Sequence, residues 1–79
     1  MPKVEIYSMG YCPYCIAAKR ILAKLGWEYR EVDITGKPKL KSEMMKRTQR
    51  HTVPQIFLDK RHIGGFDDFS AYVQKKQLI

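Results

Sequence analysis

Apolar and polar side chains alternate at the start of the chain, and the spacing then changes to one that is typical of a helix. Lys3–Ser8 alternates and predicts a strand. Pro13–Leu25 carries apolar residues every three to four positions and predicts a helix, and Trp27–Ile34 returns to alternation. A strand, a helix and a strand of this length predict a βαβ unit with two adjacent parallel strands.

The second half of the chain has shorter apolar runs separated by turn residues. Lys39–Arg50 predicts a second helix, and Ile56–Leu58 predicts a third strand. The pair Asp59-Lys60 is a plausible two-residue turn into a short fourth strand, Arg61–Ile63, which makes an antiparallel hairpin. A third helix begins at Phe66, so the predicted order is β-α-β-α-β-β-α in one domain spanning residues 1–79.

Composition excludes several classes of protein. The chain has 79 residues, and no apolar run approaches the length of a transmembrane helix, so we expect no membrane partner. The N-terminus lacks the basic and then apolar layout of a signal peptide, which predicts a cytoplasmic protein. In that reducing compartment an isolated pair of cysteines is more often catalytic than structural.

The net charge of +7 is concentrated in the segment Lys37–Arg50, which contains Glu43 as its one acidic residue. No aromatic side chain is interleaved with these cations, so we expect no nucleic-acid partner. Two other interpretations stay open: a solvated basic face, or a positive field that favours a thiolate and attracts anionic thiol substrates.

The two cysteines of the chain stand at the junction between the first strand and the first helix, as Cys12-Pro13-Tyr14-Cys15. This spacing predicts a dithiol redox site. The alternatives are a zinc half-site or inert thiols, but a closed zinc site needs four ligands, and His51 and His62 do not form a close pair.

Within this motif the position just before the helix favours the thiolate of Cys12, because unpaired N–H groups and the positive end of the dipole meet its sulfur. We therefore expect Cys12 to be the nucleophile and Cys15 to be the resolving thiol in thiol–disulfide exchange. The ring of Tyr14 either walls a groove for a peptide-like substrate or covers the helix surface.

Three separated motifs resemble those of dithiol glutaredoxins of the small bacterial type: Cys12–Cys15, Thr52–Phe57 and Gly64–Asp68. The resemblance covers nearly the whole chain. It implies a thioredoxin fold of the α/β class, with a four-stranded mixed sheet and helices on both faces, and glutathione as the electron donor.

The resemblance also implies a binding site for glutathione. Val53-Pro54 should be a cis peptide that faces the cysteines, with the Val53 backbone pairing with the cysteinyl part of glutathione. Asp67 and Asp68 should contact the γ-glutamyl amine, although both can also cap the third helix, and Lys41 should bind the glycyl carboxylate. The implied site comprises Tyr14, Lys41, Thr52, Val53, Pro54, Gly65, where glycine allows close approach, Asp67 and Asp68.

Three positions depart from the family pattern. Met9 stands where many members have a lysine three residues before the first cysteine, so one charge near Cys12 is missing. Gln49 replaces a glycine that commonly ends the second helix, and Phe66 replaces a cysteine.

The resemblance predicts an enzyme that reduces protein disulfides and glutathione mixed disulfides, acting as a monomer without a metal. Two other functions stay open. One is a carrier of an iron–sulfur cluster between two subunits, against which Pro13 and the second cysteine, Cys15, argue. The other is a reductant that depends on thioredoxin reductase, but proteins of that kind have a different insert between the cysteines.

Overall fold

The computed structural model describes residues 1–79 and contains the seven elements in the predicted order. Their bounds are β1 (Val4–Ser8), α1 (Pro13–Leu25), β2 (Tyr29–Asp33), α2 (Pro38–Thr48), β3 (Gln55–Leu58), β4 (Arg61–Gly64) and α3 (Phe66–Lys75). The helices are all too short or too polar to cross a lipid bilayer.

The predicted bounds of α1 are confirmed, whereas β2 is shorter than the predicted Trp27–Ile34. Gly26 adopts a left-handed conformation with φ of 69°, and the N–H of Trp27 donates back to the Leu22 carbonyl at 3.1 Å. Because this helix cap uses the backbone of Trp27, the strand starts only at Tyr29.

The second helix begins one residue earlier and ends two residues earlier than the predicted Lys39–Arg50. Pro38 occupies its first turn, where the missing N–H has no cost. Gln49 takes a left-handed conformation with φ of 59°, which ends the helix at Thr48. Gln49, at a position that is commonly glycine in the family, therefore adopts the left-handed cap conformation although it has a side chain.

The sheet has four strands in the order β2-β1-β3-β4. β1 and β2 are parallel, as predicted, while β3 is antiparallel to both β1 and β4. Asp59 and Lys60 form the turn of the hairpin with positive φ values of 50° and 68°. The two hairpin strands each gain one residue over the prediction, Gln55 and Gly64.

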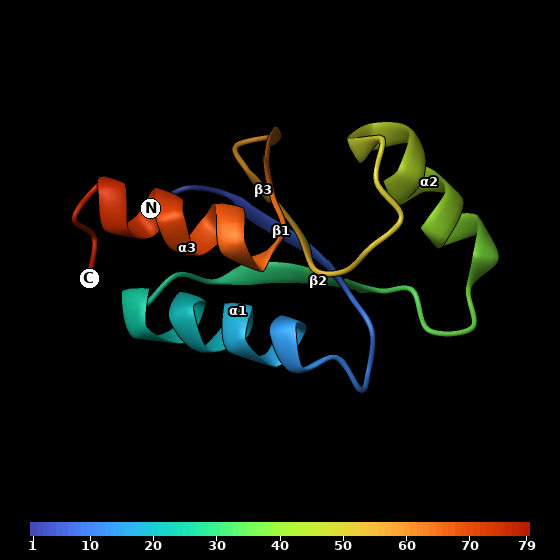
Figure 1. Ribbon diagram of the computed structural model, residues 1–79, viewed down its shortest axis with the longest axis horizontal. Helices are drawn as coiled ribbons and strands as arrows, with labels where there is room; N and C mark the ends of the chain where they lie inside the picture. Colours follow the sequence, from blue (N-terminus) through green and yellow to red (C-terminus); the bar gives the residue numbers. More distant parts are fainter.

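Helices pack on both faces of this sheet, and each face has its own core. α1 and α3 lie beside one another in Figure 1, and they cover the larger cluster, which includes Ile6 of β1 and Phe69 of α3. α2 lies apart from them and covers a smaller cluster that contains Tyr7 and Met44. Neighbouring residues of β1 thus point to opposite faces, as the alternation in the sequence predicts.

The pairing of the strands brings the chemistry-bearing loops to one edge of the sheet. Tyr7, near the end of β1, pairs with Gln55 at the start of β3, and Ile56 pairs with Gly64 at the end of β4. The starts of α1, β3 and α3 therefore meet at the same edge, although they are far apart in the sequence.

Candidate active site

Cys12 is the N-cap of α1, and its sulfur serves as the cap. The N–H of Cys15 donates to Cys12 Sγ at 3.2 Å, Pro13 fills the first turn, and this turn contains no acidic side chain. The sulfur therefore meets the positive end of the helix with no nearby carboxylate in the same turn to offset it. Cys12 is partly exposed, so a substrate sulfur can reach it.

Cys15 has a different environment, although only two residues separate it from Cys12. It is a free thiol that is fully buried. Burial, followed by the hydrogen bond with Cys12, raises the pKa of the Cys15 thiol to about 12. This contrast agrees with the predicted roles, an accessible nucleophile and a reserve thiol.

The Val53-Pro54 peptide bond is cis, as the resemblance implied. It also faces the cysteines, because the Cys12 thiol donates a long hydrogen bond of 3.7 Å to the Val53 carbonyl oxygen. This contact joins residues that are 41 positions apart and places the backbone of Val53 beside the nucleophilic sulfur.

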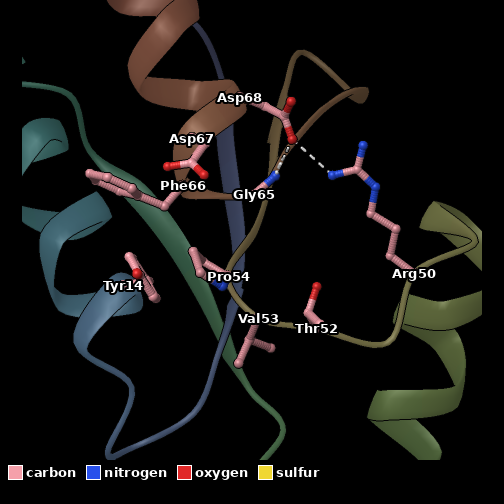
Figure 2. A pocket seen from close by; sticks show the side chains of 9 residues that line it. All are labelled: Tyr14, Arg50, Thr52, Val53, Pro54, Gly65, Phe66, Asp67 and Asp68. Carbon is pink, nitrogen blue, oxygen red and sulfur yellow. Dashed lines mark hydrogen bonds and ion pairs between the residues drawn. The ribbon is translucent and has the colours of Figure 1, made fainter.

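A cleft of about 410 Å³ adjoins this contact (Figure 2). Its walls come from the start of α1, from the segment between α2 and β3, and from the start of α3. The lining residues are Tyr14, Arg50, Thr52, Val53, Pro54, Gly65, Phe66, Asp67 and Asp68. All the predicted glutathione-binding residues except Lys41 are thus brought together.

The far wall of the cleft is the N-terminus of α3, where Asp68 is held at one oxygen atom. Its Oδ2 accepts the Gly65 N–H at 3.1 Å and a guanidinium N–H of Arg50 at 2.8 Å. The Arg50 hydrogen bond, and then that from Gly65, lower the pKa of Asp68 below its usual 3.8. Asp67 also lies on this wall, but no side chain bonds its carboxylate, which Figure 2 shows between Phe66 and Gly65.

Sequence reasoning did not assign two lining residues to the site. Arg50 was expected only as part of the basic segment Lys37–Arg50, yet it pairs with Asp68 beside the cleft. The ring of Phe66 lies 5.8 Å from that of Tyr14, so the two rings form an aromatic side wall. The sequence offered one signal for each residue: Arg50 is a cation just before the Thr52–Phe57 motif, and Phe66 is an aromatic residue within the Gly64–Asp68 motif.

Glycine is required at Gly64 more than at the predicted Gly65. Gly64 has φ of 130°, and a Cβ atom there would lie 2.3 Å from Asp68 Oδ2. A Cβ atom on Gly65 would lie 3.4 Å from the Pro54 carbonyl oxygen, which is an ordinary contact. Gly64 therefore leaves the space in which the Asp68 carboxylate turns back onto the helix start.

Lys41 lies outside the cleft. It lines a second hollow of about 360 Å³, together with Met9, Ile34, Gly36, Lys37 and Pro38. Ile34 belongs to the same apolar cluster against which Val53 packs, so the two hollows adjoin a common group of side chains. Met9, at the position where many family members have lysine, is part of this second hollow.

The two histidines do not join the cysteines. His62 Nε2 is bonded to Gln55 Oε1 at 2.7 Å, and its ring lies 5.1 Å from that of Phe57. Burial lowers the pKa of His62, which favours the neutral form of its ring. No three His, Cys, Asp or Glu side chains lie together in a way that could hold a metal ion.

Comparisons with known proteins agree with this geometry. The glutaredoxin family model matches residues 4–63. Glutaredoxin 3 of Escherichia coli is 49% identical over 71 residues, which cover 90% of this chain and 86% of that protein.

Two solved structures extend the likeness to the whole fold. The solution structure of glutaredoxin from Brucella melitensis has a TM-score of 0.83 and 44% identity, over 99% of this chain and 85% of that one. The crystal structure of a buckwheat glutaredoxin–glutathione complex has a TM-score of 0.88 and 25% identity, over 98% and 73%. The thioredoxin fold and the dithiol site are thus those of known proteins, and the chain belongs to the glutaredoxin family, whose members are glutathione-dependent thiol–disulfide oxidoreductases.

Proposed function

We propose that this chain reduces glutathione mixed disulfides and protein disulfides with electrons from glutathione. The observation that carries the proposal is the position of Cys12 Sγ, 3.7 Å from the Val53 carbonyl oxygen and beside the cleft that ends at α3. A sulfur at one end and a charged helix start at the other match the thiol and the charged γ-glutamyl end of a tripeptide thiol in chemistry.

The cysteinyl and γ-glutamyl parts of glutathione have partners in the cleft. The backbone of Val53 would pair with the cysteinyl residue and so hold its sulfur next to Cys12. Asp67 and Asp68 would attract the γ-glutamyl ammonium group, while free N–H groups at the start of α3 suit the carboxylate of the same residue. The other predicted binding residues in the cleft, Tyr14, Thr52, Pro54 and Gly65, would shape the walls.

We propose that the glycyl carboxylate lies toward Lys41 and the second hollow. Support comes from the apolar cluster that both hollows adjoin and from the exposed ammonium group of Lys41. Lys41→Gln should raise the KM for glutathione about threefold with little change in kcat, as expected for one solvent-screened ionic contact. An unchanged KM would remove Lys41 from the site.

The chemistry has two branches that begin with the same step. The Cys12 thiolate attacks one sulfur of the substrate disulfide, a new S–S bond forms, and the other sulfur leaves as a thiolate that takes up a proton. With a glutathione mixed disulfide, Cys12 becomes bonded to glutathione. A second glutathione thiolate then attacks the glutathione sulfur and releases oxidised glutathione and reduced Cys12.

With a protein disulfide, Cys12 becomes bonded to the protein, and the second thiol is needed. Cys15 loses its proton and attacks Cys12 Sγ, so the protein leaves as a dithiol and a Cys12–Cys15 disulfide remains. Two glutathione molecules reduce this disulfide and are themselves oxidised to one molecule of glutathione disulfide.

Three further expectations stay predictions: a single domain over residues 1–79, action as a monomer, and a cytoplasmic location. Size-exclusion chromatography at micromolar concentration tests the monomer. Elution at twice the monomer mass would contradict it.

The decisive experiment compares two electron donors. The protein should reduce a glutathionylated peptide rapidly with glutathione, glutathione reductase and NADPH, and slowly with thioredoxin reductase and NADPH. The opposite order would replace the proposal with a thioredoxin-like function. Absorbance in the visible range after anaerobic purification would instead support the carrier of an iron–sulfur cluster.

A further inference from the structure

A polar cluster joins α1, β2 and β1 at the end of the sheet that carries the cysteines. Lys19 Nζ lies 2.8 Å from Glu31 Oε2, and the hydroxyl of Ser8 donates to the same oxygen at 2.5 Å. Ser8 is fully buried, and the side chains of Lys19 and Glu31 are only 28% and 35% exposed. One carboxylate oxygen thus fixes the ammonium group of Lys19 against the sheet.

One member of this cluster, Lys19, belongs to the same helix as Cys15. Lys19 follows Cys15 by four positions in α1, a spacing that puts both side chains on one face of a helix. Ser8 directly precedes Met9, whose backbone acts to lower the pKa of the Cys15 thiol. The positive charge of Lys19 acts on Cys15 in the same direction.

The resolving step demands such a charge. Cys15 has no exposed surface, and burial raises the pKa of its thiol to about 12, so very little thiolate exists at neutral pH. Yet Cys15 must become a thiolate to attack Cys12 Sγ, and it must leave as a thiolate when glutathione reduces the disulfide. Water cannot solvate this charge, so protein groups have to do so.

We propose that Lys19, held by Glu31 and Ser8, is a positioning residue that stabilises the Cys15 thiolate in the dithiol branch of the reaction. In the forward step the Cys15 S–H loses its proton, its sulfur bonds to Cys12 Sγ, and the bond from Cys12 to the substrate sulfur breaks. The ammonium group of Lys19 stays protonated throughout and does not touch the substrate. The proposal rests on the function proposed above.

Glu31 keeps the ammonium group in place, although its own negative charge offsets part of the field. The hydrogen bonds from Lys19 and then from Ser8 lower the pKa of Glu31, so the pair remains charged at neutral pH. The other titratable groups that act on this cluster are Cys12 from α1, and Tyr29 and Asp33 from β2.

The test separates the two branches. The reduced protein is mixed with an equimolar amount of a small protein that contains one disulfide, without glutathione, and the reaction is quenched with acid. Each molecule then turns over once, and this single turnover needs both cysteines. The variants are Lys19→Gln, Lys19→Arg and, as a matched control on the same helix, the exposed Lys24→Gln. Reduction of a glutathionylated peptide by glutathione, which needs Cys12 alone, is measured in parallel.

A change of one unit in the pKa of Cys15 alters its thiolate fraction about tenfold at neutral pH. Because a less stabilised thiolate is also a better nucleophile, part of this effect is offset, and we expect Lys19→Gln to slow the single turnover about threefold. The rate should reach half its maximum at a higher pH than in the wild type. Lys19→Arg should restore most of the rate, and Lys24→Gln should not change it.

Three results would overturn the proposal: an unchanged single turnover in Lys19→Gln, an equal loss in Lys19→Arg, or an equal loss in the reaction that needs Cys12 alone. Thermal unfolding of each variant shows whether the fold is intact. If the wild-type protein reduced the protein disulfide but not the glutathionylated peptide, the proposed function would be refuted, but the proposal for Lys19 would not. The assay without glutathione would still test Lys19.

Discussion

Two helix N-termini form opposite walls of the cleft, and they use the same physical device for different purposes. At the start of α1 the positive end of the helix meets a sulfur, and no carboxylate lies in the first turn. At the start of α3 it meets Asp67 and Asp68. One helix end therefore meets a nucleophilic sulfur, while the other carries two carboxylates, where we propose that the charged end of glutathione binds.

The walls also differ in how they are held. Cys12 is placed by its own helix through the contact of its sulfur with the Cys15 N–H. Asp68 is placed by residues of two separate segments, Gly65 and Arg50. The difference teaches that the helix cap formed by Cys12 is local in sequence, although its thiol also contacts the distant Val53 carbonyl, whereas the carboxylate of Asp68 depends on a separate segment. Substitutions should therefore separate chemistry from binding and from stability.

The largest effect is expected on the reactive wall. Cys12→Ser should lower both disulfide-reducing activities at least a thousandfold, because a serine hydroxyl is not ionised at neutral pH and does not form disulfides. Cys15→Ser should keep the reduction of glutathione mixed disulfides and lose the reduction of protein disulfides. Activity that survived in Cys12→Ser would reverse the assigned roles.

On the binding wall we expect a loss of stability instead. Gly64→Ala should lower the free energy of unfolding by about 2–3 kcal/mol, because a Cβ atom at φ of 130° is strained and collides with the Asp68 carboxylate. Gly65→Ala is the matched control and should cost less, since its Cβ meets the Pro54 carbonyl at 3.4 Å. Urea denaturation measures both, and equal costs would refute the assignment to Gly64.

A third substitution lies outside both walls. Gln49→Gly should raise the free energy of unfolding by about 1 kcal/mol, because Gln49 ends α2 with φ of 59° and glycine adopts that conformation without strain. Gln49→Ala keeps the strain and loses the bond from Gln49 Nε2 to the Lys46 carbonyl, so it should not stabilise. Both activities should stay unchanged, which separates stability from function.

The smallest effect concerns Arg50 and acid pH. The pKa of Asp68 is lower in the folded protein than its usual 3.8, so the unfolded chain takes up this proton first as the pH falls. The resulting stability is present above the usual pKa and is lost as the pH falls through the folded one. Arg50→Gln removes the hydrogen bond that contributes most to the lowered pKa of Asp68.

Arg50→Gln should therefore lower the free energy of unfolding at pH 7 by only about 0.5 kcal/mol, because the pair is exposed, with a slightly lower Tm. The difference from the wild type should vanish near pH 2. Arg61→Gln, which removes an exposed cation on β4 that pairs with no carboxylate, is the control. A difference that persisted at low pH would show that Arg50 stabilises the fold by some means other than its pairing with Asp68.

Much of the fold follows from local patterns. The alternation in β1, the helical spacing in α1 and the turn at Asp59-Lys60 each predicted the observed element, because they depend on residues close in the chain. The wrong bounds lay where a cap decided the boundary, as at Trp27 and Gln49. Caps depend on single backbone conformations, which hydrophobic spacing does not report.

The site was predictable to the extent that family motifs carried it. The cis Val53-Pro54 bond and its approach to Cys12 agree with the resemblance. Lys41 was expected with the other binding residues, yet it lines a different hollow, because its position depends on the whole placement of α2 against the sheet.

The sequence by itself determined the order of elements, the paired thiols and the helix start that one of them caps, since the patterns behind these features extend over only a few neighbouring residues. Only the tertiary structure decided that Arg50 would hold Asp68, and that Ser8 and Glu31 would fix Lys19 against the sheet. These contacts join separate strands and helices. Their physical basis is the pairing of strands and the packing of helices, which bring distant side chains within hydrogen-bonding distance only when the chain has folded.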